Sequence, residues 1–437
     1  MQLPRVWTLA AMALALAVEL RAAADALQFN QVNGSSPNAG VEARSADKRQ
    51  PKEIEFSADQ AGDFAAGGSP VGEFVALSAQ DYQLSALCQP QKWTIKQKKA
   101  ASMWIGLSAY SLPESDQLVL VAGNGKEAVV TRQGSGAASA AVPGAEVVLE
   151  YRPGPACSPS AGGSFAVAGV GVRFSKEWNI KKEAVCGNTN SMKNARCFRD
   201  SGDAKDQEMY ATSQAVIRTE RVREDNRIVV CTAWLWGNQG HIVTNNHCFS
   251  SQEMVDNAAF HLGVEAASCS GSCQPGTCPI AKEIKGAGNV KFIKSDPTID
   301  IALLQLTNGA SEVVSKFGYL KIRFGFAKGG EQIYIPQHPN GGARQIAKTD
   351  DDNDAAIATI RETDLSVRVQ GKLFTGLIGY PADTETGSSG SPVIARGTNH
   401  VVGLHRIGNC NNAGTPSDKL LAYLATPGLD NDGAALQ

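Results

Sequence analysis

The sequence predicts an all-β protein in which a small antiparallel β-sandwich precedes a pair of β-barrels. Short runs of alternating apolar and polar residues recur along the chain, separated by Gly, Pro, Ser and Asp turns. Helical periodicity is weak throughout, and its best candidate, after Lys419, is short. A length of 437 residues, with 43% hydrophobic residues, suits two packed domains.

The N-terminus has the layout of a secretory signal peptide, which we expect to cover residues 1–24. Arg5 precedes the apolar stretch 6–18, and three alanines at 22–24 offer a cleavage site. The apolar stretch is too short to span a bilayer. Residues 25–55 are polar and predict a linker or pro-segment. We therefore expect a secreted, extracellular protein.

Residues 56–180 predict the β-sandwich domain. Strand-like runs occur at 92–95, 102–107, 117–121, 146–151 and 165–174. Cys88 and Cys157 lie in this segment and are a candidate disulfide. The segment contains no His and no catalytic cluster. We expect it to bind an unknown partner or to act as a pro-domain.

Residues 183–427 predict the paired barrels, and residues 428–437 a frayed tail. Strand-like runs occur at 227–236, 241–244, 301–306, 332–336, 356–360, 376–380, 391–395 and 401–404.

The charge pattern argues against nucleic acid as a partner. Lys and Arg number 41, Asp and Glu 43, and the formal net charge is -2, with no basic block. A second apolar run of membrane length is absent from the sequence, so we expect no membrane insertion.

Ten cysteines fit an oxidising compartment, where an even number suggests up to five disulfides. Cys269, Cys273 and Cys278 form a cluster, but zinc sites usually match one close pair with another, and no second pair is present. We expect disulfides, with no metal and no cofactor.

Three local signals point to nucleophilic catalysis. His247 ends a buried strand, Asp300 leads into an apolar strand, and Ser389 lies in a Gly-Ser-Ser-Gly-Ser loop. A serine hydroxyl needs an imidazole to remove its proton, and a buried carboxylate to hold that imidazole. The N–H groups of Gly387 and Ser389 would stabilise the oxyanion, at roughly 3–4 kcal/mol each. Each signal alone is ordinary, but their joint occurrence in the order His–Asp–Ser predicts a catalytic triad.

Residues 186–424 resemble the chymotrypsin-fold, trypsin-like serine peptidases, and among these the bacterial lysyl endopeptidase type. The matching motifs are Thr244-x-x-His247-Cys248, Thr298-x-Asp300-x-x-Leu303-Leu304, Gln337-His338-Pro339-Asn340, Thr384-Glu385-x-Gly387-Ser388-Ser389-Gly390-Ser391-Pro392 and Gly403-Leu404-His405. The resemblance implies the disulfides Cys231–Cys248 and Cys186–Cys410, and it pairs Cys197 with one cysteine of the 269/273/278 cluster, for which we take Cys269. The other two would then pair together.

One position departs from the pattern of animal trypsins, which carry an Asp just before the nucleophile to receive the new N-terminus on activation. Ser388 stands there in this chain. Activation through that salt bridge is therefore not expected.

The residue before the cleaved bond (P1) is predicted less directly. Asp383 lies six residues before Ser389, the spacing of the trypsin pocket carboxylate, and Asp418 lies near the acidic residue of the lysyl type. Either carboxylate would attract Lys or Arg. Thr384 and His405, however, resemble the pair with which glutamyl endopeptidases receive an acidic side chain. A carboxylate in a closed pocket repels Glu, so we favour Lys or Arg.

The predicted function is a secreted serine endopeptidase acting on protein or peptide substrates. A glutamyl-specific peptidase is one alternative. The other is a non-catalytic binding or adhesion protein whose sandwich domain carries the function.

Overall fold

The computed structural model describes residues 29–31, 69–76, 81–84, 89–97, 100–133, 136–155, 157, 163–174, 190–223, 227–273, 277–350, 353, 355–369, 372–408, 412–425 and 434–435. The predicted signal peptide, most of the segment 25–55, and Cys88, Cys186 and Cys410 lie outside these residues. Strands dominate the described residues, and the predicted all-β fold is confirmed. In the described part of the chain, no helix is both long and apolar enough to cross a membrane.

The chain divides into two compact units. The first unit comprises Met1–Gln60 and Gly72–Ser175, and the second comprises Ala61–Val71 and Lys176–Gln437.

The first unit holds two antiparallel sheets. One has the strand order β1-β4-β11-β6-β7, and in the other β12 pairs with β2, β3 and β5 while β5 pairs with β9 and β10. The strands are β1 (Phe29–Gln31), β2 (Ser69–Ala76), β3 (Asp81–Leu84), β4 (Gln91–Lys96), β5 (Ala100–Ser111), β6 (Gln117–Ala122), β7 (Glu127–Val129), β8 (Thr131–Gln133), β9 (Gly136–Ala138), β10 (Val142–Pro143), β11 (Glu146–Arg152) and β12 (Gly163–Phe174). Side chains of both sheets share one core, among them Ile95, Leu149 and Phe165.

Strand β11 shows why this segment folds as a half-buried sheet. Val147, Leu149 and Tyr151 are buried on one face, as the period of two requires. The opposite face carries charges that pair across strands. Glu150 lies opposite Lys92, with 2.7 Å between carboxylate and ammonium.

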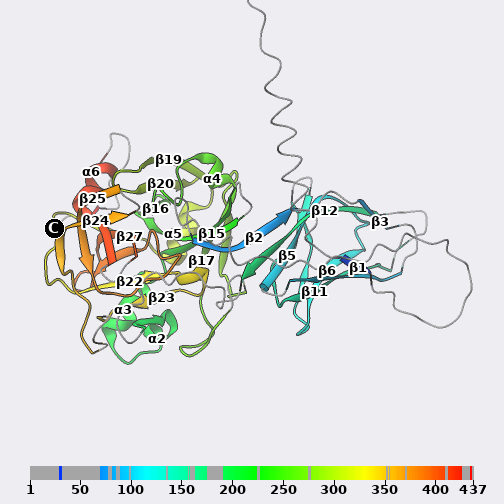
Figure 1. The fold of residues 1–437 in the computed structure, drawn as a ribbon, viewed down its shortest axis with the longest axis horizontal. Helices are drawn as coiled ribbons and strands as arrows, with labels where there is room; N and C mark the ends of the chain where they lie inside the picture. Colours follow the sequence, from blue (N-terminus) through cyan, green and yellow to red (C-terminus); the bar gives the residue numbers. More distant parts are fainter. Residues whose placement is uncertain are drawn as a thin grey trace, which may run out of the picture. The chain divides into compact units, whose positions relative to one another are not determined.

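The second unit begins with one set of antiparallel strands, ordered β18-β17-β14-β15-β16-β20-β19 (Figure 1). These are β14 (Val216–Val222), β15 (Arg227–Trp236), β16 (His241–Thr244), β17 (Ala258–Leu262), β18 (Lys282–Lys285), β19 (Val290–Asp296) and β20 (Ile301–Leu306). All four residues of β16 are buried, because β15 and β20 flank it on both edges.

A second set of strands follows in the order β13-β23-β22-β26-β27-β28-β25-β24, with β21 paired to β27 and β29 paired to β21. These are β13 (Met192–Asn194), β21 (Ile322–Arg323), β22 (Ile333–Gln337), β23 (Gln345–Ala347), β24 (Glu362–Val369), β25 (Lys372–Tyr380), β26 (Pro392–Ala395), β27 (Val401–Ile407), β28 (Asn412–Pro416) and β29 (Ala434–Ala435). The predicted strand at 356–360 forms only isolated bridges, at Ile357 and Thr359.

Apolar side chains of the two strand sets meet in one core. Trp234 and Leu303 come from the first set, and Tyr334 and Leu404 from the second, all fully buried. The loops that leave β16, precede β20 and precede β26 are therefore anchored on a single packed body.

The helices are short, which explains their weak signal in the sequence. They are α2 (Ala195–Arg199), α3 (Ala204–Ser213), α4 (Gln252–Asp256), α5 (Ala310–Phe317) and α6 (Ser417–Leu424), with a 3₁₀ turn η2 (Pro339–Gly341). Local caps fix their starts: the Asp203 side chain accepts from Lys205 N, and the Ser251 side chain from Met254 N. Helices α2 and α4, with five residues each, are too short to show an apolar period.

Candidate active site

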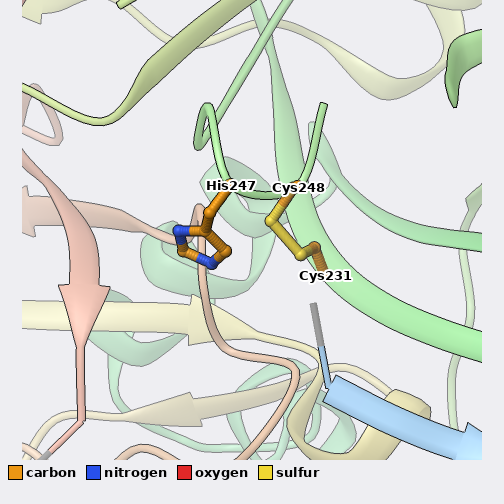
Figure 2. A group of neighbouring side chains, drawn as sticks. All are labelled: Cys231, His247 and Cys248. Atoms are coloured by element: carbon orange, nitrogen blue, oxygen red, sulfur yellow. A yellow bond between two sulfur atoms is a disulfide. The ribbon is translucent and has the colours of Figure 1, made fainter. Parts of the chain in front are cut away.

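His247 lies in the turn that follows β16. Cys248, the next residue, forms a disulfide with Cys231 of β15, so the turn is covalently tied to the neighbouring strand (Figure 2). The ligand atoms of these three residues lie within 4.8 Å of one another, which is a spacing suited to a metal. Both sulfurs are in the S–S bond, however, and a cysteine binds a metal as the free thiolate.

Asp300 lies in the turn before β20 and contacts His247 twice. Its Oδ1 accepts a hydrogen bond from His247 N at 3.0 Å, and its Oδ2 lies 2.8 Å from His247 Nδ1. The Asn245 side chain donates to the Asp300 carbonyl at 2.8 Å. Asp300 has a left-handed φ of 55°, an unfavourable conformation that these contacts hold in place.

A carboxylate at Nδ1 selects the tautomer of His247. The carboxylate accepts a hydrogen bond from Nδ1–H, so the proton stays on Nδ1 and Nε2 is the basic nitrogen. Burial raises the pKa of the Asp300 carboxyl, but the charge and hydrogen bonds of His247, together with the Arg406 guanidinium, outweigh burial and hold that pKa below its usual value. Asp300 is therefore ionised at neutral pH.

Ser389 is partly buried in the loop before β26, and backbone bonds fix this loop against two strands. The Ser389 carbonyl accepts from Thr232 N of β15 at 2.8 Å, and Gly390 N donates to the carbonyl of His405 in β27 at 2.9 Å. Gly390 has φ 88°, and a Cβ there would lie 2.1 Å from Thr232 O. Only glycine fits this position beside the serine.

Gly387 occupies an equally restricted position. Its φ is 96°, and a Cβ would lie 2.8 Å from the carbonyl oxygen of His338. Its own carbonyl accepts from the Thr232 hydroxyl at 2.9 Å. Ser388, between the two, is fully buried and accepts from Glu385 N through its hydroxyl at 3.1 Å.

Asn340, a residue to which the sequence assigned no role, clamps the segment before Ser389. Its backbone N–H donates to Thr386 O at 2.5 Å, and its side-chain amide to Glu385 at 2.6 Å. Asn340 adopts a φ of 52°, which asparagine tolerates better than most residues. Asn340 belongs to the motif Gln337-His338-Pro339-Asn340, but this motif does not indicate which residues Asn340 contacts.

The predicted pocket residues are all in the second unit. Asp383 is fully buried, and its Oδ2 accepts from Ser191 N at 2.7 Å. The Thr384 hydroxyl donates to the Asn412 side chain at 2.9 Å. Asp418 lies in the first turn of α6, and its Oδ1 is buried with no hydrogen-bond partner among the described residues.

His405 is buried in β27, close enough to His247 to respond to its charge. Burial, and secondarily the charge of His247, lower the pKa of His405 to about 3, so it is neutral at working pH. The Tyr380 hydroxyl lies 2.7 Å from His405 Nδ1, and burial raises the pKa of that hydroxyl well above its usual value.

Two further disulfides lie in the second unit, Cys197–Cys269 and Cys273–Cys278. These two pairs and Cys231–Cys248 are the ones expected from the resemblance, in which Cys273 and Cys278 were the two cysteines left to pair together. Cys157 is also disulfide-bonded. Its expected partner, Cys88, and the pair Cys186–Cys410 involve residues outside those described.

Comparison with known proteins finds a similar domain in this region. Residues 231–404 match the trypsin-like peptidase domain. A curated relative, secreted RxLR effector protein 73 of Plasmopara viticola, is 34% identical over 251 residues, which are 57% of this chain and 58% of that protein. The match thus spans little more than half of the relative's own length.

Solved structures with a similar chain path include two proteases. The MamO protease domain of Magnetospirillum magneticum covers 50% of this chain and all of its own, at 15% identity and a TM-score of 0.35. The active form of the Rv3671c protease of M. tuberculosis covers 52% of this chain and 88% of its own, at 20% identity and a TM-score of 0.37. Residues 231–404, which include His247, Asp300 and Ser389, are thus similar to the trypsin-like peptidase domain.

Proposed function

We propose that this protein is a secreted serine endopeptidase that cleaves peptide bonds through an acyl-enzyme on Ser389. The observation that carries the proposal is the His247–Asp300 pair, in which a buried, ionised carboxylate lies 2.8 Å from Nδ1 of the imidazole. His247 removes the Ser389 proton through Nε2 and returns it to the leaving amine. The N–H groups of Gly387 and Ser389 stabilise the oxyanion.

Ser389→Ala tests this function. Wild-type protein should react with a serine-directed fluorophosphonate and digest an unfolded protein, and the variant should do neither. Ser250→Ala, the same change at an exposed serine three residues after His247, is the control and should keep both activities. Wild-type protein that neither labels nor cleaves would contradict the proposal and favour the non-catalytic alternative.

Secretion is part of the proposal. It is supported by the expected signal peptide, by the disulfides and by the secreted effector among the relatives. Expression of the full chain in a secreting host should release a protein that lacks residues 1–24, which N-terminal sequencing checks. The same measurement reports whether the first unit is kept as a partner-binding domain or removed as a pro-domain.

We propose Lys or Arg as the P1 residue. Asp418 supports this choice, because its buried oxygen has no hydrogen-bond partner among the described residues and a substrate cation would satisfy it. Asp383 is the second carboxylate, although its Oδ2 already accepts from Ser191 N.

Glutamate is the alternative P1 residue, and a specific contact favours it. A neutral His405 whose Nδ1 accepts from Tyr380 carries its hydrogen on Nε2, where it can donate to a carboxylate. Peptides differing only in Lys, Arg, Glu or Gln at P1 separate the two. Cleavage after Lys or Arg, lost in Asp418→Asn, supports the basic pocket, and cleavage after Glu overturns it.

A further inference from the structure

The catalytic carboxylate has a second charged neighbour. Arg406 lies in β27, directly after His405, and its Nε is 3.6 Å from Asp300 Oδ2, the oxygen that also contacts His247 Nδ1. This distance is longer than a hydrogen bond and marks an ion pair. One carboxylate oxygen is thus placed between an imidazole and a guanidinium.

The guanidinium is buried and held in place. The side chains of Arg406 and Asp300 are 4% and 7% exposed. Arg406 Nη1 donates to Thr298 O at 3.3 Å, and its Cζ lies 4.5 Å from the centroid of the Phe374 ring. Arginine does not lose its proton in proteins, so a fixed positive charge stands beside the triad.

The other charged groups around the triad do not cancel this charge. Asp300 is the negative partner of both His247 and Arg406. His405, the remaining titratable group close to His247 on β27, is neutral. Asp296 of β19 adds a second negative charge that acts on Arg406. A proton that arrives on His247 is attracted by Asp300 and repelled by Arg406.

We propose that Arg406 is a positioning residue of the triad: its buried guanidinium shares the Asp300 carboxylate with His247, and its charge sets the pH at which His247 becomes protonated. The inference rests on the proposed peptidase function. Because like charges disfavour the protonated imidazole, His247 stays a free base to lower pH than a triad with Asp300 alone would allow. The pH range in which the enzyme is active therefore extends further to the acid side.

The test is the pH profile of kcat/KM for Arg406→Gln and Arg406→Lys. In R406Q the acidic limb should move up by about one pH unit, because the repelling charge is gone. R406K keeps the charge and should keep the wild-type limb. Arg323→Gln is the matched control, since the Arg323 side chain is also buried, at 9% exposed, and pairs with Glu331. Its limb should not move. Coincident limbs for R406Q and wild type would overturn the proposal.

A second measurement covers the case in which R406Q does not fold. The His247 ring can be titrated by proton NMR in full-length Asp300→Asn, without any need for turnover. This variant removes the attraction of the carboxylate and leaves the repulsion of Arg406, so the midpoint should fall below the usual histidine value of about 6.5. A midpoint at or above that value overturns the inference. A low midpoint in this variant, together with wild-type protein that fails to cleave or label, would keep the inference and reject the peptidase function.

Discussion

The two units keep their charged side chains in different places. In the described residues of the first unit, charges lie mainly on an exposed sheet face, as in the pairs Lys92–Glu150 and Lys96–Glu146. In the second unit many charged side chains are buried: Arg218, Arg221, Asp300, Arg323, Arg344, Asp383 and Arg406 are all less than 10% exposed. Exposed pairs contribute little to stability, whereas a buried charge is costly unless it is paired.

This contrast indicates what each kind of charge does. An exposed pair across two strands specifies register, and its loss is tolerated. A buried charge is found where it pairs with a neighbouring group, as Asp300 pairs with His247. The following predictions rank substitutions in both units by the size of the effect, and a reversed ranking would break the contrast.

The largest effect is expected for Asp300→Asn. The amide loses the negative charge and permits the wrong imidazole tautomer, so kcat should fall by about 10⁴-fold. The measurement is steady-state cleavage of a peptide substrate, with circular dichroism to show that the fold is retained. A folded Asp300→Asn protein with activity within tenfold of wild type would contradict the role of the pair.

Asn340→Ala should have the next largest effect. Loss of the side-chain bond to Glu385 loosens the loop that carries Gly387 and Ser389, and we expect kcat to fall about 10–100-fold. Fluorophosphonate labelling should slow in parallel, because it uses the same oxyanion donors. Asn308→Ala, at an exposed position, should change neither rate. Unchanged kcat in Asn340→Ala would show that other contacts suffice.

Asp116→Asn tests an exception, a buried carboxylate in the first unit. Asp116 is 6% exposed and accepts from the Tyr151 hydroxyl at 2.5 Å and from Gly154 N at 2.9 Å. Burial raises the pKa of Asp116, but these bonds together hold it below its usual value. The unfolded carboxyl binds protons at higher pH, so the stabilisation is complete above about pH 4 and is lost as pH falls through the folded value.

The expected outcome for Asp116→Asn is a loss of about 1–3 kcal/mol in unfolding free energy at neutral pH, and a smaller loss under acid conditions. Urea unfolding followed at pH 7 and at pH 3, with the near-ultraviolet signal as probe, measures both. An equal loss at the two pH values would mean that packing, and not the charge, is responsible.

The smallest effect is expected for Lys92→Gln. The Lys92 side chain is 50% exposed, and its pair with Glu150 is screened by water. The unfolding free energy should change by less than about 1 kcal/mol, and the change should vanish in 1 M salt. A loss as large as that of Asp116→Asn would remove the distinction between exposed and buried charge.

Much of this fold was predictable from the sequence, because a strand shows a local alternation of apolar and polar residues. The runs at 227–236 and 241–244 coincide with β15 and β16. Helices α2 and α4 were missed because they have only five residues each.

The site divides in the same way. His247 and Asp300 could be named because each sits in a short motif, and the structure brings these two together. Arg406 stands next to His405 in the sequence, yet its partner lies on another strand set, so no local pattern reveals it. Asn340 acts on a residue 45 positions later, which is equally invisible to spacing.

The glycines beside Ser389 limit which substitutions this loop tolerates. A single added carbon at Gly390 would meet the carbonyl oxygen of Thr232 at 2.1 Å, within a strand that is itself fixed by its neighbours. In a library of random substitutions, Gly390 should therefore be as depleted of functional variants as Ser389. The strictest requirement in this loop thus includes a residue whose contribution is the absence of a side chain.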